Sequence, residues 1–184
     1  TGAALLRYSD IPKGAERKEL QQRVIAGIRY AILTHRTGTE KCVDNKQWGG
    51  NWQSAMWACP IGWAAWLLWD DLHTELQKGV ESVVSSEADR FLNVRPPSGR
   101  WSDTKAEENG WDLSCIALAP NMFPKHPHAA AWREKAIEYM INVLSVGADR
   151  KDKRLVDGRP VCDWNCTENL HPDFTLENHD MLHP

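Results

Sequence analysis

The chain of 184 residues has the length of one ordinary domain, and with 42% hydrophobic residues it can bury a sizeable core. Because 22 Lys and Arg residues are balanced by 25 Asp and Glu residues, the formal net charge is −3, which supplies no basic field for a nucleic-acid backbone. The longest apolar run, from Ile61 to Trp69, is too short to cross a membrane. The composition therefore argues against disorder, nucleic-acid binding and a membrane span.

The first long element is predicted to be an amphipathic helix from Glu16 to His35. Leu20, Val24, Ile28 and Ile32 recur at every fourth position, which places them on one face of a helix. We expect this face to pack on the core and the opposite face to contact water.

The second element, from Trp52 to Asp70, is predicted to be a helix that is apolar on almost every side. Such a helix is expected to be surrounded by protein. Although 10 of the 16 aromatic residues are Trp, we expect the indoles within this segment to be core residues rather than ligand contacts. These are Trp57, Trp63, Trp66 and Trp69.

Three further helices are expected along the chain. The segment from Leu72 to Leu92 is amphipathic, and its outer, solvated face carries charged residues such as Glu87. The segment from Asp103 to Met122 begins with charge and continues as a mostly buried helix. The segment from His128 to Ser145 is again amphipathic.

The last part of the chain is less regular. A polar loop is expected from Gly147 to Asp173, and Phe174 is expected to begin a further buried helix that the chain end at Pro184 interrupts. Convincing strand alternation is missing, and the stretch from Lys153 to Val161 is a weak candidate.

The order of these helices predicts the fold. Amphipathic and enclosed helices alternate, as two concentric rings of helical hairpins would require. We therefore expect an all-α fold, a partial (α/α)n toroid of antiparallel helical hairpins, over a single domain of residues 1–184. Because the pattern is interrupted near Pro184, we expect a piece of a longer protein that is incomplete at its C-terminus. A plain helical bundle or a superhelical repeat array is the alternative.

The polar segments before the enclosed helices, residues 45–53, 101–109 and 174–180, share an unusual composition. Each combines carboxamide or carboxylate groups with an aromatic residue. Amides and carboxylates hydrogen-bond sugar hydroxyls, and the C–H face of a pyranose stacks on an aromatic ring. The alternative is that the indoles only pack the hairpin turns. The pattern predicts a glycan site that includes Trp48, Asn51, Trp52, Gln53, Trp101, Asp103 and Asn109.

Two of these segments resemble a known group of enzymes. The Gly-Gly-Asn51-Trp52-Gln53 start of a buried helix and the Glu177-Asn178-His179 triplet resemble the Asn-Trp and Asn-His motifs of α/α-toroid polysaccharide lyases, which include heparinase and alginate-lyase-like families. The resemblance implies β-elimination at a uronic acid residue. It also implies that Asn178 neutralises the substrate carboxylate, that His179 is the base, and that Asn51 or Gln53 positions the sugar.

The sequence departs from that family in its tyrosines. Tyr8, Tyr30 and Tyr139 are the three tyrosines of the chain, and the pattern places Tyr30 and Tyr139 on helix faces. The catalytic Tyr that the family uses is therefore expected beyond Pro184. The second, mostly β domain of the family is not seen in this sequence.

Two other functions remain open. A glycoside hydrolase of the (α/α)6 type would use two carboxyl groups from these same polar segments. The candidates are Asp103, Glu107, Glu108 and Glu177. On a helix Glu108 shares a face with Trp111 and Asp112, although acidic residues in a first turn also simply complement the helix dipole. The third possibility is a glycan-binding helical repeat protein without catalysis.

No cofactor or metal is predicted. The five cysteines are an odd number and are widely scattered, and Cys162-Asp-Trp-Asn-Cys166 beside His171 is a weak match to a zinc site. The expected partner is a polysaccharide or oligosaccharide, with no nucleic acid and no membrane. A polysaccharide substrate predicts a secreted or periplasmic location.

Overall fold

The structure is a computed structural model that describes residues 1–96, 105–164, 166–178 and 181–183. The described residues are mostly helical, which confirms the coarser fold prediction. The α-helices are α1 (Gly2–Tyr8), α2 (Gly14–Thr34), α3 (Ser54–Leu67), α4 (Thr74–Asp89), α5 (Lys105–Met122) and α6 (Ala129–Val143). Short 3₁₀ turns are η1 (Trp69–Asp71), η2 (Gly147–Lys151) and η3 (Val161–Asp163).

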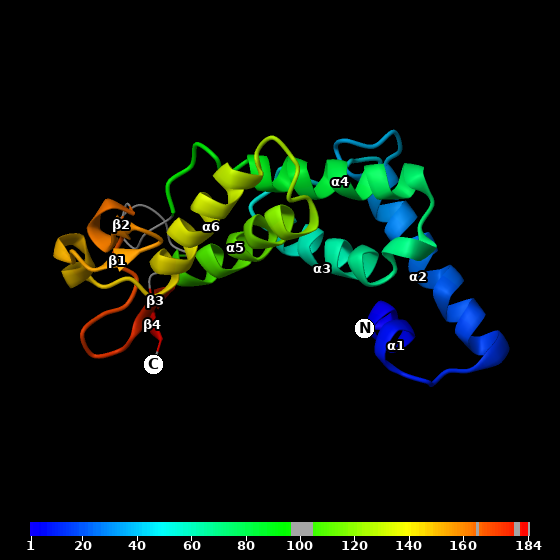
Figure 1. The fold of residues 1–184 in the computed structure, drawn as a ribbon, viewed down its shortest axis with the longest axis horizontal. Helices are drawn as coiled ribbons and strands as arrows, with labels where there is room; N and C mark the ends of the chain where they lie inside the picture. Colours follow the sequence, from blue (N-terminus) through cyan, green and yellow to red (C-terminus); the bar gives the residue numbers. More distant parts are fainter. Residues whose placement is uncertain (97–104, 165, 179–180, 184) are drawn as a thin grey trace.

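The helices form two packed layers. Helices α3 and α5 contact each other along their lengths, and α2, α4 and α6 pack against one or both of them (Figure 1). The helix α1 lies at one end of the molecule, against α2 and α3. The array formed by the described residues is open and does not close into a ring.

The core lies between the two layers and is built from small and β-branched side chains. Val80, Val83 and Val84 of α4 are fully buried against Ala55 and Ala58 of α3 and the apolar face of α5. Small residues bring the helices close together, since a Cβ at Gly62 of α3 would lie 2.6 Å from Leu118 of α5. The enclosed face of α3 thus contains almost no large side chain.

The tryptophans of α3 are not core residues, which corrects the sequence prediction. Trp57, Trp63 and Trp66 are 41%, 50% and 38% exposed, whereas Trp69 is partly buried and packs on the core. The reason is that the positions of α3 that pack most closely against neighbouring helices are occupied by small residues such as Ala55, Ala58 and Gly62. The sequence suggested a helix enclosed all round because composition does not tell which apolar face is covered.

A second correction concerns Glu87 of α4. The sequence placed it on a solvated face, but its side chain is completely buried. The helix is otherwise amphipathic as predicted, with its apolar side against α3 and α5. Glu87 is buried because it has several polar partners, which are described below.

The C-terminal part also differs from the prediction. The element after Phe174 is a strand, β3 (Leu176–Asn178), paired antiparallel with β4 (Met181–His183), rather than a helix. The weak strand candidate from Lys153 to Val161 is confirmed as a hairpin of β1 (Leu155–Val156) and β2 (Arg159–Pro160). Both hairpins lie at the end of the molecule opposite α1 (Figure 1).

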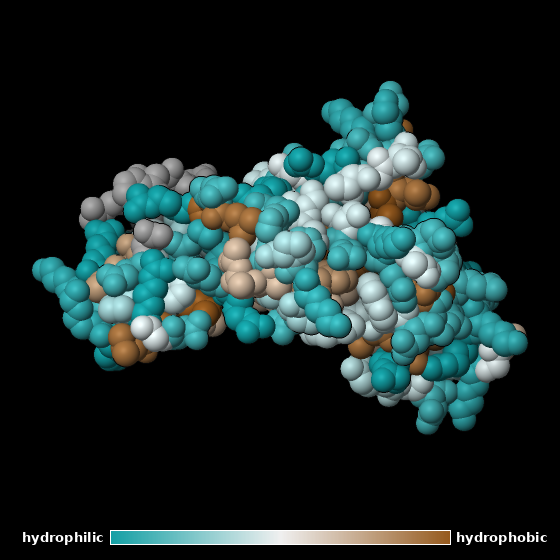
Figure 2. Space-filling view, turned by 45° about the horizontal axis from the view of Figure 1, so that its top comes forward, coloured by the Kyte–Doolittle hydropathy of each residue, from teal (hydrophilic) through white to brown (hydrophobic). Residues whose placement is uncertain are grey.

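The outer surface is mainly hydrophilic in the view of Figure 2, where hydrophobic residues gather in small separate patches. Among the described residues, none of the helices combines the length and the apolar character that a membrane crossing demands.

Candidate functional site

The loop that leads into α3 is held firmly against the end of α2. The backbone N–H of Trp48 donates to the carbonyl of Thr34 at 3.0 Å, and the indole Nε1 donates to the carbonyl of Ala31 at 2.9 Å. The ring of Trp48 also lies edge-on to His35, with ring centroids 4.6 Å apart. Trp48, predicted as a sugar contact, thus has a clear packing role in this loop.

The two glycines that follow are required by the geometry of this loop. Gly49 and Gly50 have φ angles of 108° and 71°, which L-residues rarely adopt. A Cβ on Gly49 would also lie 2.3 Å from Nε2 of His35, and one on Gly50 would lie 2.5 Å from Arg36. The Gly-Gly pair therefore lets the start of α3 approach the end of α2.

Glu87 connects this loop to α4. Its Oε1 accepts hydrogen bonds from the backbone N–H of Gly50 at 2.7 Å and from Nε2 of His35 at 3.1 Å. Its Oε2 accepts from Ser54, the first residue of α3, and from Nη1 of Arg90 at 2.6 Å. A single buried carboxylate thus ties together the ends of α2, α3 and α4.

These contacts favour the ionised form of Glu87. Burial raises the pKa of the Glu87 carboxyl, but hydrogen bonds from His35, Ser54, Gly50 and Arg90 outweigh it and lower the pKa to about 2. On His35, Nε2 carries the proton donated to Glu87, because Nδ1 accepts a hydrogen bond from the N–H of Thr37 at 3.2 Å. The network is a rigid polar frame rather than a reacting group.

A cleft of about 470 Å³ opens beside this frame. It is formed by Arg36 after α2, the loop before α3, the residues after α4, the first turns of α5 and Tyr139 of α6. Three cationic side chains, Arg36, Arg90 and Arg95, line it together with two carboxyl groups, Glu108 and Asp112. The cleft combines positive charge with acid groups, which suits an anionic ligand that must exchange a proton.

Asp112 and Tyr139 are the buried polar groups of this cleft. Asp112 is 4% exposed and Tyr139 is fully buried, and within the described residues neither Asp112 Oδ1 nor the Tyr139 hydroxyl has a hydrogen-bond partner. Burial, followed by repulsion from Glu108, raises the pKa of Asp112 to about 8. Burial, followed by the charge of Asp112, also raises the pKa of Tyr139 far above its usual value. The Asp112 carboxyl is therefore protonated at neutral pH.

An aromatic pair lies at this end of α3. The rings of Trp52 and Trp111 have centroids 5.3 Å apart and are tilted by 40°, and Trp52 is 48% exposed. Trp52 lines the cleft, so one indole face is available to a ligand beside the charged groups.

The structure brings some of the predicted site residues together. Trp52 and Glu108 line the cleft. Asn51 is exposed at the same loop, next to Gly50 and Trp52, and partly buried Gln53 immediately precedes α3. These residues come from segments that are far apart in the sequence.

Asn109 is positioned differently. Its side chain is fully buried, and its Nδ2 donates to the carbonyl of Asn142 on α6 at 3.1 Å. Asn142 in turn accepts from the N–H of Thr167 at 2.7 Å. Asn109 thus joins a polar network that holds the C-terminal segment against α5 and α6.

The remaining predicted residues lie elsewhere. Trp101, Asp103 and His179 lie outside the described residues. Glu177 and Asn178 belong to β3, which packs against α5, the helix that carries Glu108 (Figure 1). β3 and α5, which carry residues from two of the predicted polar segments, are therefore neighbours in the fold.

Sequence reasoning missed most of the charged groups of the cleft. The sequence indicates only that Asp112 shares a helix face with Glu108, and it predicts that Tyr139 lies on a helix face. The i, i+4 spacing of two carboxyl groups on an otherwise apolar helix is the signal that could have identified Asp112. Nothing in the sequence indicates that Arg36 and Arg90 reach the same cleft.

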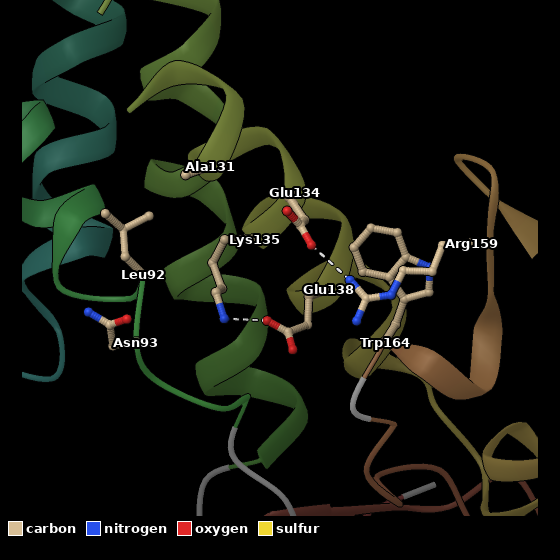
Figure 3. A pocket seen from close by; sticks show the side chains of 8 residues that line it. All are labelled: Leu92, Asn93, Ala131, Glu134, Lys135, Glu138, Arg159 and Trp164. Carbon is tan, nitrogen blue, oxygen red and sulfur yellow. Dashed lines mark hydrogen bonds and ion pairs between the residues drawn. The ribbon is translucent and has the colours of Figure 1, made fainter. Parts of the chain in front are cut away.

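A second cleft, of about 380 Å³, lies along α6 and is lined also by Leu92 and Asn93 after α4 and by Arg159 and Trp164 (Figure 3). Its charged side chains bind one another: Arg159 donates to Glu134 at 2.8 Å, and Lys135 donates to Glu138. The Arg159 guanidinium also lies over the ring of Trp164, 4.5 Å from its centroid. The Arg159–Glu134 pair holds the hairpin on α6, whereas Lys135 and Glu138 pair within α6. The cleft beside Asp112 is the better candidate site, because the buried Asp112 Oδ1 and Tyr139 hydroxyl have no hydrogen-bond partner among the described residues.

The described residues contain no cluster of three or more His, Cys, Asp or Glu side chains that could hold a metal ion. Cys162 and Cys166 are free thiols, and Cys162 Sγ lies 3.4 Å from Nζ of Lys153.

Comparison with protein-family models, curated proteins and solved structures gives no match for this chain.

Proposed function

We propose that this chain belongs to an enzyme that cleaves a uronic-acid-containing polysaccharide by β-elimination, and that the cleft beside Asp112 binds the uronate. The observation that carries the proposal is a carboxyl group with a pKa of about 8 in a cleft lined by three arginines. The arginines attract the anionic sugar, and Trp52 offers a face for stacking on it.

The chemistry needs two groups. A base removes the proton α to the uronate carboxylate, and the electron pair left behind forms a double bond as the neighbouring glycosidic C–O bond breaks. The leaving oxygen takes up a proton, from the protonated base or from water, and becomes a hydroxyl. Negative charge develops on the carboxylate, so a hydrogen-bond donor to it lowers the barrier. The protonated Asp112 carboxyl supplies such a donor, and Glu108, in the same cleft, is the proton acceptor among the described residues. The family resemblance gives the same two roles to Asn178 and His179, and the Glu108→Gln variant below distinguishes the two assignments of the base.

The two-layer array supports the toroid as part of the same proposal. Helices α3 and α5 would belong to its inner ring, and α2, α4 and α6 to its outer ring. The cleft lies where the inner helices begin, which is where the predicted polar segments would meet.

A glycoside hydrolase is the second candidate, because one observation favours it. Glu108 and Asp112 lie one helical turn apart, and repulsion from Glu108 contributes to the raised pKa of Asp112. Two carboxyl groups with separated pKa values are the arrangement in which one acts as general acid and the other as base or nucleophile.

A variant of Asp112 distinguishes the two reactions. We expect the protein to convert uronate polysaccharides to products with the ultraviolet absorbance of an unsaturated uronate. Asp112→Asn keeps a neutral hydrogen-bond donor, so lyase activity should persist, whereas a hydrolase would lose its acid and its turnover. Glu108→Gln should lower lyase turnover by about 10²- to 10⁴-fold. Glu107→Gln, one residue away on another face of α5, is the matched control.

Each other outcome has a definite meaning. Reducing ends without ultraviolet absorbance would assign the protein as a hydrolase. Lyase turnover that is unaffected by Glu108→Gln would remove Glu108 from the reaction. Polymer binding without any cleavage would refute the enzyme and leave the glycan-binding function.

A further inference from the structure

Helix α3, with Trp52 just before it, carries a row of apolar side chains that the rest of the protein covers only in part. Trp52, Met56, Cys59, Trp63 and Trp66 follow one another at intervals of four, three, four and three residues. At about 100° per residue these positions fall on one face of the helix. The fully buried residues Ala58 and Ala65 lie about 120° to 140° around the helix from the centre of this row. Cys59, within the row, is partly buried and its Sγ donates to the carbonyl of Ser114 on α5. We call the row of five residues the α3 stripe.

The α3 stripe is open to solvent at its aromatic positions. Trp52, Trp63 and Trp66 are between 38% and 50% exposed. The rings of Trp63 and Trp66 stack on each other, with centroids 5.2 Å apart and planes at 28°. Two large indoles that pair side by side on a surface make a broad, flat platform, which is unusual for a face in permanent contact with water.

The α3 stripe is continuous with the cleft. Trp52 forms its first position and also lines the cleft with Arg90 and Asp112. At a rise of about 1.5 Å per residue, the stripe extends about 20 Å from Trp52 to Trp66. Beyond the first turn a groove of about 380 Å³ follows between α1 and α3, lined by Cys59 and Trp63. A ligand longer than the cleft would extend from it along the α3 stripe.

We propose that the α3 stripe binds the polysaccharide chain beyond the cleft, with sugar units stacked on Trp52 and on the Trp63–Trp66 platform. This inference rests on the proposed function, from which it takes the class of polymer, a uronic-acid-containing polysaccharide. It adds that the enzyme acts on long chains, and that α3 contributes a second binding region remote from the reacting bond.

The chemistry of the face favours a sugar over a protein helix. The helix from Ser54 to Leu67 contains no charged residue, so it offers no ion pair that would fix the register of a partner. The rings of Trp63 and Trp66 stack on each other, so they leave no gap between them into which a side chain of a partner helix could insert. A flat apolar surface matches the C–H face of a pyranose instead.

Binding of polymer by the variants tests the proposal directly. We expect the double variant Trp63→Ala/Trp66→Ala to raise the Kd for a long uronate polysaccharide at least tenfold in calorimetric titration. The affinity for an oligosaccharide short enough to fit the cleft alone should change less than twofold. Trp57→Ala is the matched control, since Trp57 is equally exposed but lies on the opposite side of α3 from Trp66 and near Trp48.

Two further measurements make every outcome decisive. Far-UV circular dichroism and thermal melting identify a variant that does not fold, and then the single variant Trp63→Ala, at the most exposed of the two positions, is used for the same titration. Sedimentation of the wild-type protein and the double variant detects self-association. A dimer that the double variant breaks would overturn the proposal, because the stripe would then be a protein interface.

Cleavage assays separate this inference from the proposed function. Unchanged polymer affinity in a folded double variant, together with cleavage by the wild-type protein, would overturn the α3 stripe alone. Loss of polymer affinity in the double variant, with no cleavage by the wild-type protein, would support the stripe and refute the enzyme.

Discussion

The carboxyl group of Asp112 should make the protein less stable as the pH rises from 5 to 8. Its pKa is about 8 in the folded protein, against an ordinary value of 3.8. Between these two values the folded protein holds a proton that the unfolded chain has released, so the free energy of unfolding falls as the pH rises. The contribution is fully present below pH 3.8 and is lost as the pH passes through 8.

The size of the effect follows from the shift. Each pH unit within this window changes the free energy of unfolding by about 1.4 kcal/mol, so the wild-type protein loses about 3 to 4 kcal/mol between pH 5 and pH 8 through this one group. Asp112 is 4% exposed, so solvent screens it little. Asp112→Asn has a similar shape and does not titrate, and it should therefore become more stable than the wild-type protein by a margin that grows with pH.

Urea denaturation at pH 5, 6, 7 and 8, followed by circular dichroism, measures this margin. Asp70→Asn, at an exposed position, is the control and should show no such trend. A margin between Asp112→Asn and the wild-type protein that stays constant across the four pH values would refute the assignment of a protonated acid in the cleft.

Two other changes test the frame beside the cleft. Glu87→Gln should destabilise the protein by about 3 to 5 kcal/mol in urea denaturation at pH 7, because it breaks a buried ion pair and leaves the Arg90 charge partly uncompensated. A loss below 1 kcal/mol would show that the network contributes little. Gly49→Ala should lower stability by about 2 to 3 kcal/mol in the same assay, since its φ of 108° is strained for alanine and the new Cβ meets His35. Gly27→Ala, within α2 and without any atom near the added Cβ, should be neutral or stabilising.

Hydrophobic periodicity predicted the five longest helices of the described residues, but not the short α1 (Gly2–Tyr8). The expected helix from Glu16 to His35 is α2, and the one from His128 to Ser145 is α6, with ends displaced by one or two residues. Periodicity is a local property, so it identifies which residues share a face. In α3, hydrophobicity identified the apolar positions but did not indicate which of them would pack against a neighbouring helix.

The candidate site was only partly predictable for a related reason. Glu87 accepts hydrogen bonds from Gly50 and His35, which precede it by 37 and 52 residues. Any pattern within α4 makes Glu87 an ordinary solvated helix residue, since the groups that stabilise its charge belong to other elements. Its burial is a property of the tertiary fold, as is the proximity of Arg36 to Asp112.

The polar frame and the cleft depend on each other. Glu87 holds its charge because His35, Ser54 and Arg90 donate to it, and the same Arg90 lines the cleft. If Glu87 were neutral, Arg90 would lose its strongest partner and its guanidinium would be drawn toward the Asp112 carboxyl, whose ionised form it favours. An ionised Asp112 would no longer donate a hydrogen bond to a uronate. Burial and the charge of Glu108 raise the pKa of Asp112 most, and Glu87 adds to them through its own charge and by holding the Arg90 guanidinium.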